Sequence, residues 1–192
     1  MDNLVLILVV LVIVAAGVVA AVVYQRRRSA RLRAHFGPEY ERLLAAGHSR
    51  SETEAALEAR ARRVESLQLR ELPPGERQRI TDAWRAVQAR FADDPRRAVG
   101  EADRLLEQTM QALGYPVGDV ERCAADLSVH HPALVDDYRV AHHIKLRAAD
   151  GQSSTEDLRK ATMAYRALIG ALLQGRIEQG RIEEEHRHDR VA

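Results

Sequence analysis

The sequence predicts an all-α protein, with a single N-terminal transmembrane helix, a soluble multi-helix bundle and a disordered charged tail. Three observations predict this class. The chain opens with an uncharged apolar run, continues with apolar side chains at helical spacing, and ends in dense mixed charge. The expected divisions are residues 1–25 (anchor), 26–37 (basic juxtamembrane helix), 38–175 (helical domain) and 176–192 (tail).

The apolar run covers residues 4–24 and reads LVLILVVLVIVAAGVVAAVVY. A helix rises about 1.5 Å per residue, so this run spans roughly 31 Å, close to the thickness of a hydrocarbon core. Inside lipid the backbone must satisfy its own hydrogen bonds, which favours a helix despite the many valines. We therefore expect a single-pass span, with the lipid bilayer as a partner.

Positive charge is confined to one end of this run. Only Asp2 precedes it, and arginines follow it at Arg26, Arg27, Arg28, Arg31 and Arg33. Arginines stay on the cytoplasmic side, so the pattern predicts a plasma-membrane protein with its N-terminus outside and its helical domain in the cytoplasm. The same arginines are candidate contacts for an anionic membrane surface. The alternative is a signal peptide and secretion after cleavage, although the basic segment that normally opens a signal peptide is missing.

Small residues inside the run offer a second contact. Ala16 and Ala20, and Gly17 and Ala21, stand four residues apart. This spacing lets two helices approach closely in a bilayer, so a homodimer through this face is one expectation. The other is that these residues are ordinary filler.

Glycine and proline divide the rest of the chain into helices. Gly37-Pro38 ends the basic helix and begins a short one that stops at Gly47. Ser51 and Glu54 fit a capping box for a further helix that runs to about Leu69. Its inward residues are expected to be Leu57, Ala61, Val64 and Leu67.

Two longer helices follow Pro73-Pro74-Gly75. The first carries the strongest apolar stripe, formed by Ile80, Trp84, Val87 and Phe91. Asp94 caps the second, with Pro95 in its first turn, and Gly114 ends it. Its expected inward residues are Val99, Ala102, Leu106, Met110 and Leu113.

Three more helices complete the predicted bundle. A short one buries Val120, Cys123, Ala124 and Leu127, and the cysteine is interpreted as a core residue. The next begins at His131-Pro132 and turns Val135, Tyr138, His142 and Leu146 inward. Ser154 and Asp157 cap the last, which stops at Gly175 and buries Leu158, Ala161, Tyr165, Leu168, Ile169 and Leu172.

Composition excludes several classes of function. Lys+Arg 29 against Asp+Glu 28 leaves a net charge of +1, which disfavours nucleic acid as a partner. The single cysteine excludes an intrachain disulfide and a zinc site built from several cysteines. The sequence has no phosphate loop, dinucleotide fingerprint or nucleophile elbow, so it predicts no catalytic residue and no cofactor.

A metal site is the alternative that the histidines leave open. His131, Asp136 and His142 are the candidate ligands, because imidazole and carboxylate groups bind zinc or iron. Their spacing does not match the i, i+3 or i, i+4 pairs of helical metal sites. We interpret them primarily as packed or surface residues.

Four stretches resemble a bacterial family of the actinobacterial type. They read RLRAHFGPEYERLL, AWRAVQARFADDPRRAVGEADRLLEQTMQALGYPV, ADLSVHHPALVDDYRVAHHI and STEDLRKATMAYRALI. The family is uncharacterised and consists of hypothetical or secreted-labelled proteins with one N-terminal transmembrane segment, an arginine cluster and an α-helical domain. The resemblance implies this architecture and no activity. It also implies that the position of His130 is commonly aspartate, which argues against a ligand there.

Two functions are consistent with these observations. The first is a membrane-anchored, non-enzymatic adaptor or scaffold that contacts a protein partner at the membrane surface. The second is a metal-assisted hydrolase or oxidase with a His/Asp site in the bundle. The sequence favours the first, since it shows an anchor and no catalytic motif.

Overall fold

The computed structural model describes the backbone of residues 2–174 and the side chains of residues 10–174. These residues form helices joined by loops, with no strand among them, which confirms the all-helical class. The expected charged tail, 176–192, and the stop at Gly175 lie outside the described residues. The described part divides into two compact units, one up to Glu58 and one from Ala59 onward.

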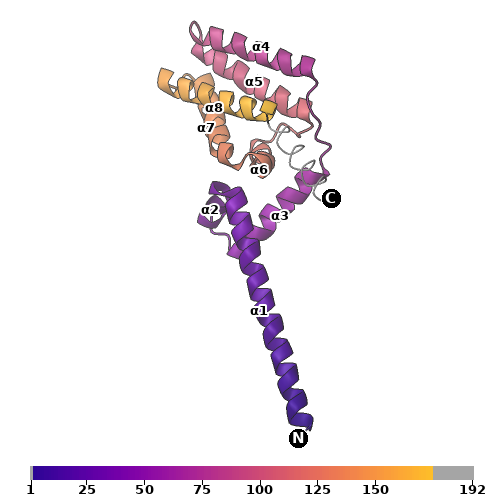
Figure 1. Cartoon of the computed structure of the whole chain (residues 1–192). Coiled ribbons are helices and arrows are strands. Elements are labelled where there is room, and N and C mark those ends of the chain that lie inside the picture. The colour runs from indigo at the N-terminus through magenta and orange to yellow at the C-terminus, as the bar shows by residue number, and fades with distance from the viewer. Residues whose placement is uncertain (1, 175–192) are drawn as a thin grey trace. The chain divides into compact units, whose positions relative to one another are not determined.

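The first unit contains one long helix and a short one. Helix α1 (Asp2–Phe36) is continuous, so the apolar run and the basic segment belong to one element. Gly37 then adopts a φ of 44°, and α2 (Pro38–Ala45) begins directly after it, as predicted. Figure 1 shows α2 beside the C-terminal end of α1, and these two helices contact each other. Phe36, Tyr40 and Leu43 are buried in this unit.

The cap of helix α3 (Arg50–Ser66) lies two residues before the expected one. The capping box is formed by Ser49 and Glu52: the Ser49 amide donates to Glu52 at 2.8 Å, and the Glu52 amide donates to the Ser49 hydroxyl at 3.3 Å. The prediction of Ser51 and Glu54 was therefore wrong. Both pairs fit the sequence pattern, and the Glu54 carboxylate is instead used by contacts described below.

Two packed helices open the second unit. Helix α4 (Pro74–Phe91) packs mainly against α5 (Pro95–Leu113), and Figure 1 shows α4, α5 and α8 as neighbouring rods. Only Val87 of the predicted stripe on α4 is buried. Ile80, Trp84 and Phe91 are half-buried, so the stripe is less deeply packed than expected. The expected inward residues of α5 are all buried.

Local capping determines where α5 starts and stops. The Arg97 amide donates to the Asp94 carboxylate at 3.1 Å, which confirms the predicted cap. Gly114 ends the helix with a φ of 96°, in the left-handed region where glycine is favoured. A Cβ at Gly114 would lie 2.7 Å from the Gln68 carbonyl oxygen, so this position requires glycine for two independent reasons.

The later helices follow the predicted order. Helix α6 (Val120–His130) buries Cys123, and a 3-10 turn, η1 (Pro132–Leu134), leads into α7 (Val135–Ala149). The prediction that Leu146 points inward was wrong, because this side chain is 51% exposed. The buried face of α7 continues through Ile144 and Ala148 instead, which turns Leu146 to the other side of the helix.

Helix α8 (Thr155–Gln174) closes the described chain. The amide of Asp157 donates to the Ser154 hydroxyl, and the amide of Ser154 donates to the Asp157 carboxylate, both at 3.1 Å. This arrangement is the predicted capping box. The expected apolar residues of α8 are all buried, and α8 contacts both α5 and α7.

Candidate functional site

The basic segment of α1 carries the five arginines singled out in the sequence. Arg26, Arg27, Arg31 and Arg33 are exposed, and Arg28 is half-buried. Arg33 forms an ion pair with Glu41 at 2.8 Å. Within the described residues, Arg26, Arg27 and Arg31 have no hydrogen bond or ion pair to another side chain. Their guanidinium groups are therefore available to an external anion.

Arg28 is held by a carboxylate from α3. Its Nε and Nη2 atoms donate to the two oxygens of Glu58, each at 2.5 Å, a fork that matches guanidinium to carboxylate. These bonds and the charge of Glu58 raise the pKa of Arg28. The pair links α1 to the first half of α3 within the first unit.

Glu54 is the buried polar centre of this unit. Its Oε1 atom accepts hydrogen bonds from Ser29, from the Tyr40 hydroxyl at 3.3 Å, and from Arg50 Nε at 3.2 Å. Glu54 is 7% exposed and Ser29 is 6% exposed. Three helices thus supply one hydrogen-bonded cluster. An acidic residue near the start of α3 was the only sign of this cluster in the sequence.

The structure does not bring the three metal-ligand candidates together. His142 faces Asp103, Asp136 forms an ion pair with Arg139 at 3.6 Å, and His131 is half-buried. Burial and the neighbouring His130 lower the pKa of His131. Among the side chains that the structure describes, no group of three or more His, Cys, Asp or Glu is arranged to hold a metal ion.

A polar cluster that the sequence analysis missed lies inside the second unit. Asp103 on α5 is 2% exposed and accepts a hydrogen bond from the Tyr165 hydroxyl at 2.9 Å. His142 Nδ1 lies 3.4 Å from the same carboxylate, and Lys145 Nζ lies 3.0 Å from its other oxygen. Burial and the Asp103 charge raise the pKa of Tyr165, so its hydroxyl stays protonated.

Cys123 lies in apolar surroundings, as predicted. It is 3% exposed, and its Sγ is 3.4 Å from the Pro116 carbonyl oxygen. Burial raises the pKa of this thiol, which keeps it protonated and weakly nucleophilic. Tyr138, buried nearby on α7, also has a raised pKa because of burial and the cysteine beside it. These groups form part of the core.

A further buried carboxylate joins α6 to the end of α3. Asp126 is fully buried, and its Oδ2 atom accepts a hydrogen bond from Arg63. Its Oδ1 atom has no hydrogen-bond partner within the described residues. Burial raises the pKa of Asp126, and the charges of Arg63, Arg122 and Arg60 oppose that rise.

The apolar part of α1 leaves its described large side chains exposed. Leu11 is 66% exposed and Val19 is 62% exposed, and none of the most apolar window of the helix is buried. The small residues Ala16, Gly17, Ala20 and Ala21 are exposed on the same helix. By length and composition, Val10–Phe36 is a candidate membrane span. A signal sequence near the N-terminus meets the same criteria of length and composition.

Comparisons with known proteins returned no match: no family model, no curated protein and no solved structure matches this chain.

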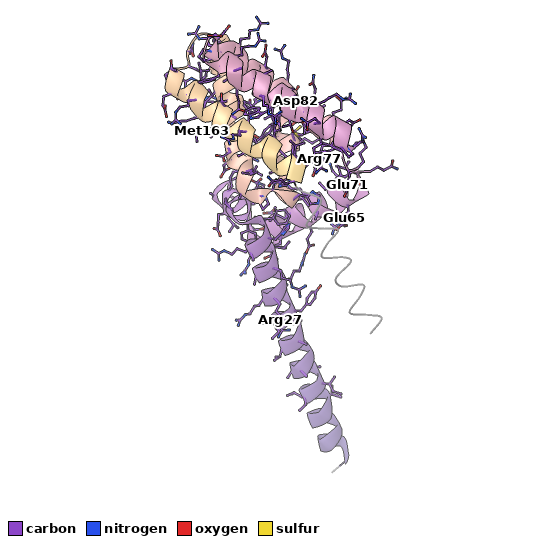
Figure 2. All side chains as sticks on the ribbon, turned by 45° about the horizontal axis from the view of Figure 1, so that its top comes forward. Arg27, Glu65, Glu71, Arg77, Asp82 and Met163 are labelled. Carbon is purple, nitrogen blue, oxygen red and sulfur yellow. The ribbon has the colours of Figure 1, made fainter. Side chains whose placement is uncertain are left out.

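Figure 2 shows how the charged side chains are distributed over the helices. Arg27 projects from α1, Glu65 and Glu71 lie around the end of α3 and the loop after it, and Arg77 and Asp82 lie on α4. Outside the basic segment, both positive and negative side chains occur on the longer described helices, including α3, α4, α5, α7 and α8. Among the described residues, the densest run of a single charge sign is therefore on α1, immediately after the apolar run.

Proposed function

We propose that this protein is a single-pass, membrane-anchored and non-enzymatic adaptor whose helical domain lies at the cytoplasmic surface of the plasma membrane. The observation that carries the proposal is the apolar half of α1, whose large side chains are exposed. Leaving such side chains in water is unfavourable by about 25 cal/mol for each Å² of apolar surface. Transfer into lipid removes this cost.

The arginines after the run support the proposed orientation. Arg26 and Arg27 are exposed and lie within the first turn after Tyr24. Guanidinium groups resist translocation, which keeps them and the domain behind them on the cytoplasmic side. The same architecture is what the resemblance to the actinobacterial-type family implies, and membership in that family remains part of the proposal.

The adaptor role is supported by tethering and by the surface of the second unit. Fixing a domain to a membrane raises its effective concentration toward other membrane proteins. Val117, Val140, Leu146 and Met163 are large apolar side chains that remain more than one third exposed. Met163 can be located on α8 in Figure 2. We propose that a protein partner contacts one or more of these exposed apolar side chains.

Anchoring is tested by alkaline extraction of membranes that contain the full chain. The wild-type chain should remain in the membrane pellet. The double substitution Val14→Lys and Val18→Lys should release it, because two charges in the span oppose insertion by about 2.5–3.5 kcal/mol each. Ala30→Lys adds charge outside the apolar run and should leave the chain in the pellet. Release of the wild-type chain would contradict the anchor.

The adaptor role is tested by photo-crosslinking in cells. A photoreactive phenylalanine is placed at Val140, Leu146 or Met163, and Arg104, an exposed charged position on α5, serves as the control. The proposal predicts a reproducible protein adduct at one or more of the apolar positions and none at Arg104. Identical background at all four positions would contradict an adaptor that uses this surface.

A further inference from the structure

The basic end of α1 and the start of α3 enclose a hollow of about 420 Å³. The residues that line one side are Val22, Gln25, Arg26, Arg28 and Ser29, and those on the other side are Arg50, Ser51, Glu54 and Ala55. This volume lies within the range of about 300–1,000 Å³ that is typical of small-molecule sites. All the lining residues belong to the first unit, so the hollow is a feature of that unit alone.

The lining of this hollow is rich in groups that bind phosphate. It contains three arginines, Arg26, Arg28 and Arg50, together with the hydroxyls of Ser29 and Ser51. Guanidinium groups suit phosphate because their donors are arranged in a planar fork that can bind two oxygens at once. Val22, which belongs to the apolar run, completes one edge. The hollow therefore presents both cationic and apolar surface.

These groups retain donors for a ligand. Arg26 and the Ser51 hydroxyl have no hydrogen bond or ion pair to another side chain in the described part of the chain. Arg28 uses its Nε and Nη2 atoms for Glu58, and Arg50 uses Nε for Glu54. A guanidinium group carries five N–H donors, so both paired arginines keep at least two. The two-bond pair with Glu58 also orients the Arg28 side chain.

One lining group opposes an anion. The Glu54 carboxylate is negative and lines the hollow. Its Oε1 atom already accepts hydrogen bonds from Ser29, Tyr40 and the charged Arg50, which stabilise the carboxylate. Arg28 is itself paired with Glu58, so the three arginines face two carboxylates and leave one excess positive charge at the hollow. The hollow therefore carries a net positive charge.

We infer that this hollow binds an anionic phosphate group, and that the phosphate belongs to the headgroup of a membrane phospholipid. The inference rests on the proposed function, because an inserted α1 places Val22 at the edge of the hydrocarbon core and Arg26 at headgroup depth. A phospholipid has an acyl chain that would contact Val22 and a charged phosphate that would contact Arg26. Inorganic phosphate shares the chemistry and is distinguished by experiment.

The test compares two neighbouring arginines of equal charge. Arg26 lines the hollow, whereas Arg27 does not and is also exposed and without a side-chain partner among the described residues. Each is replaced by glutamine in the full chain, purified in a neutral detergent. Phosphatidylglycerol is titrated in and binding is followed by native mass spectrometry, with phosphatidylcholine and inorganic phosphate as separate arms. Circular dichroism verifies that helix content is unchanged.

Wild-type protein should bind one phosphatidylglycerol saturably and phosphatidylcholine at least tenfold more weakly. Arg26→Gln should weaken phosphatidylglycerol binding more than tenfold. Arg27→Gln should weaken it by at most about fivefold, the effect of one arginine in a diffuse surface field. Ser51→Ala should also weaken binding, by about three- to tenfold, since it removes one neutral hydrogen bond.

Two results would overturn the inference. Equal losses for Arg26→Gln and Arg27→Gln would show that only diffuse charge attracts the lipid. Inorganic phosphate that binds as tightly as phosphatidylglycerol would assign the hollow to the free anion and contradict the lipid headgroup. Neither result affects the anchor, which alkaline extraction tests separately.

Discussion

The Tyr165 hydroxyl donates a hydrogen bond of 2.9 Å to Asp103 across the interior of the second unit. Both side chains are buried, and they come from α8 and α5. His142 and Lys145 approach the same carboxylate from α7. One acidic residue thus connects three helices of the bundle through polar contacts.

Tyr165→Phe should destabilise the bundle by about 1–3 kcal/mol, the cost of losing a buried hydrogen bond to a charged group. The free energy of unfolding is measured by urea titration of the full chain in detergent, with the fluorescence of Trp84, the single tryptophan, as reporter. Tyr24→Phe is the matched control, because Tyr24 is 66% exposed. Equal stability of the two variants would show that the Asp103 contact contributes nothing.

Gly114→Ala should destabilise the protein by more than about 1–2 kcal/mol. The alanine must adopt the left-handed backbone conformation of Gly114, which is unfavourable for a residue with a Cβ. Its Cβ would also lie 2.7 Å from the Gln68 carbonyl oxygen. Gly100→Ala is the control on the same helix, where a Cβ meets nothing within 4 Å. This control should be stabilising by about 0.5–1 kcal/mol, because alanine favours a helix interior. The same urea titration measures both variants, and a neutral Gly114→Ala would contradict the close approach of the Gln68 backbone to Gly114.

Ser49→Ala should loosen the start of α3, because Ser49 caps the Glu52 amide. A lost cap costs about 1 kcal/mol, equivalent to about fivefold faster exchange in amides that open locally. Hydrogen exchange of residues 50–54 measures this effect in the full chain. Ser51→Ala, which changes the other serine that fits a capping pattern, should leave exchange within twofold of wild type. Faster exchange in Ser51→Ala alone would assign the cap to Ser51.

Asp126→Asn should change how stability depends on pH. The folded-state pKa of Asp126 is raised, so protonation of this carboxyl at low pH stabilises the folded state over the unfolded state. Its contribution is fully present below the unfolded pKa of about 3.9 and is lost as pH rises through the folded-state pKa.

The difference in unfolding free energy, wild type minus Asp126→Asn, should therefore decrease from pH 4 upward. Urea titrations of both proteins at a series of pH values measure this difference. The pKa values of Glu52, Glu156 and Asp157 are lowered, so these residues make stability change with pH in the opposite direction. Both proteins contain them, and the subtraction removes their contribution. A difference that increases with pH would show that the Arg63 ion pair outweighs burial.

Features determined by neighbouring residues could be predicted from the sequence. The caps at Asp94 and Ser154, the break at Gly37 and the left-handed Gly114 all depend on residues close along the chain. Even here, two overlapping patterns at the start of α3 could not be separated. The choice between Ser49 and Ser51 depended on Glu54, which Ser29 and Tyr40 engage from other helices.

Features determined by distant residues could not be predicted. Asp103 lies 39 residues before His142 and 62 before Tyr165, and an acidic residue within α5 is typical of a solvated face. The useful signal was the i, i+3 spacing of His142 and Lys145 beside the apolar face of α7. The buried face of α7 includes Ile144 and Ala148. Choosing Ile144 instead of Leu146 as the next inward residue would have predicted correctly that Leu146 is exposed.

Cysteine labelling tests the central claim, that α1 crosses the membrane with the domain inside, most directly. Cys123 is the only cysteine, so Cys123→Ala gives a background for single substitutions at Asn3, Val14 and Gln174. Cells that express the full chain are treated with a membrane-impermeant maleimide before and after permeabilisation. Asn3→Cys should be labelled in intact cells, Gln174→Cys only after permeabilisation, and Val14→Cys in neither condition. Labelling of Gln174→Cys in intact cells, or recovery of the chain from the medium without residues 1–24, would contradict this topology.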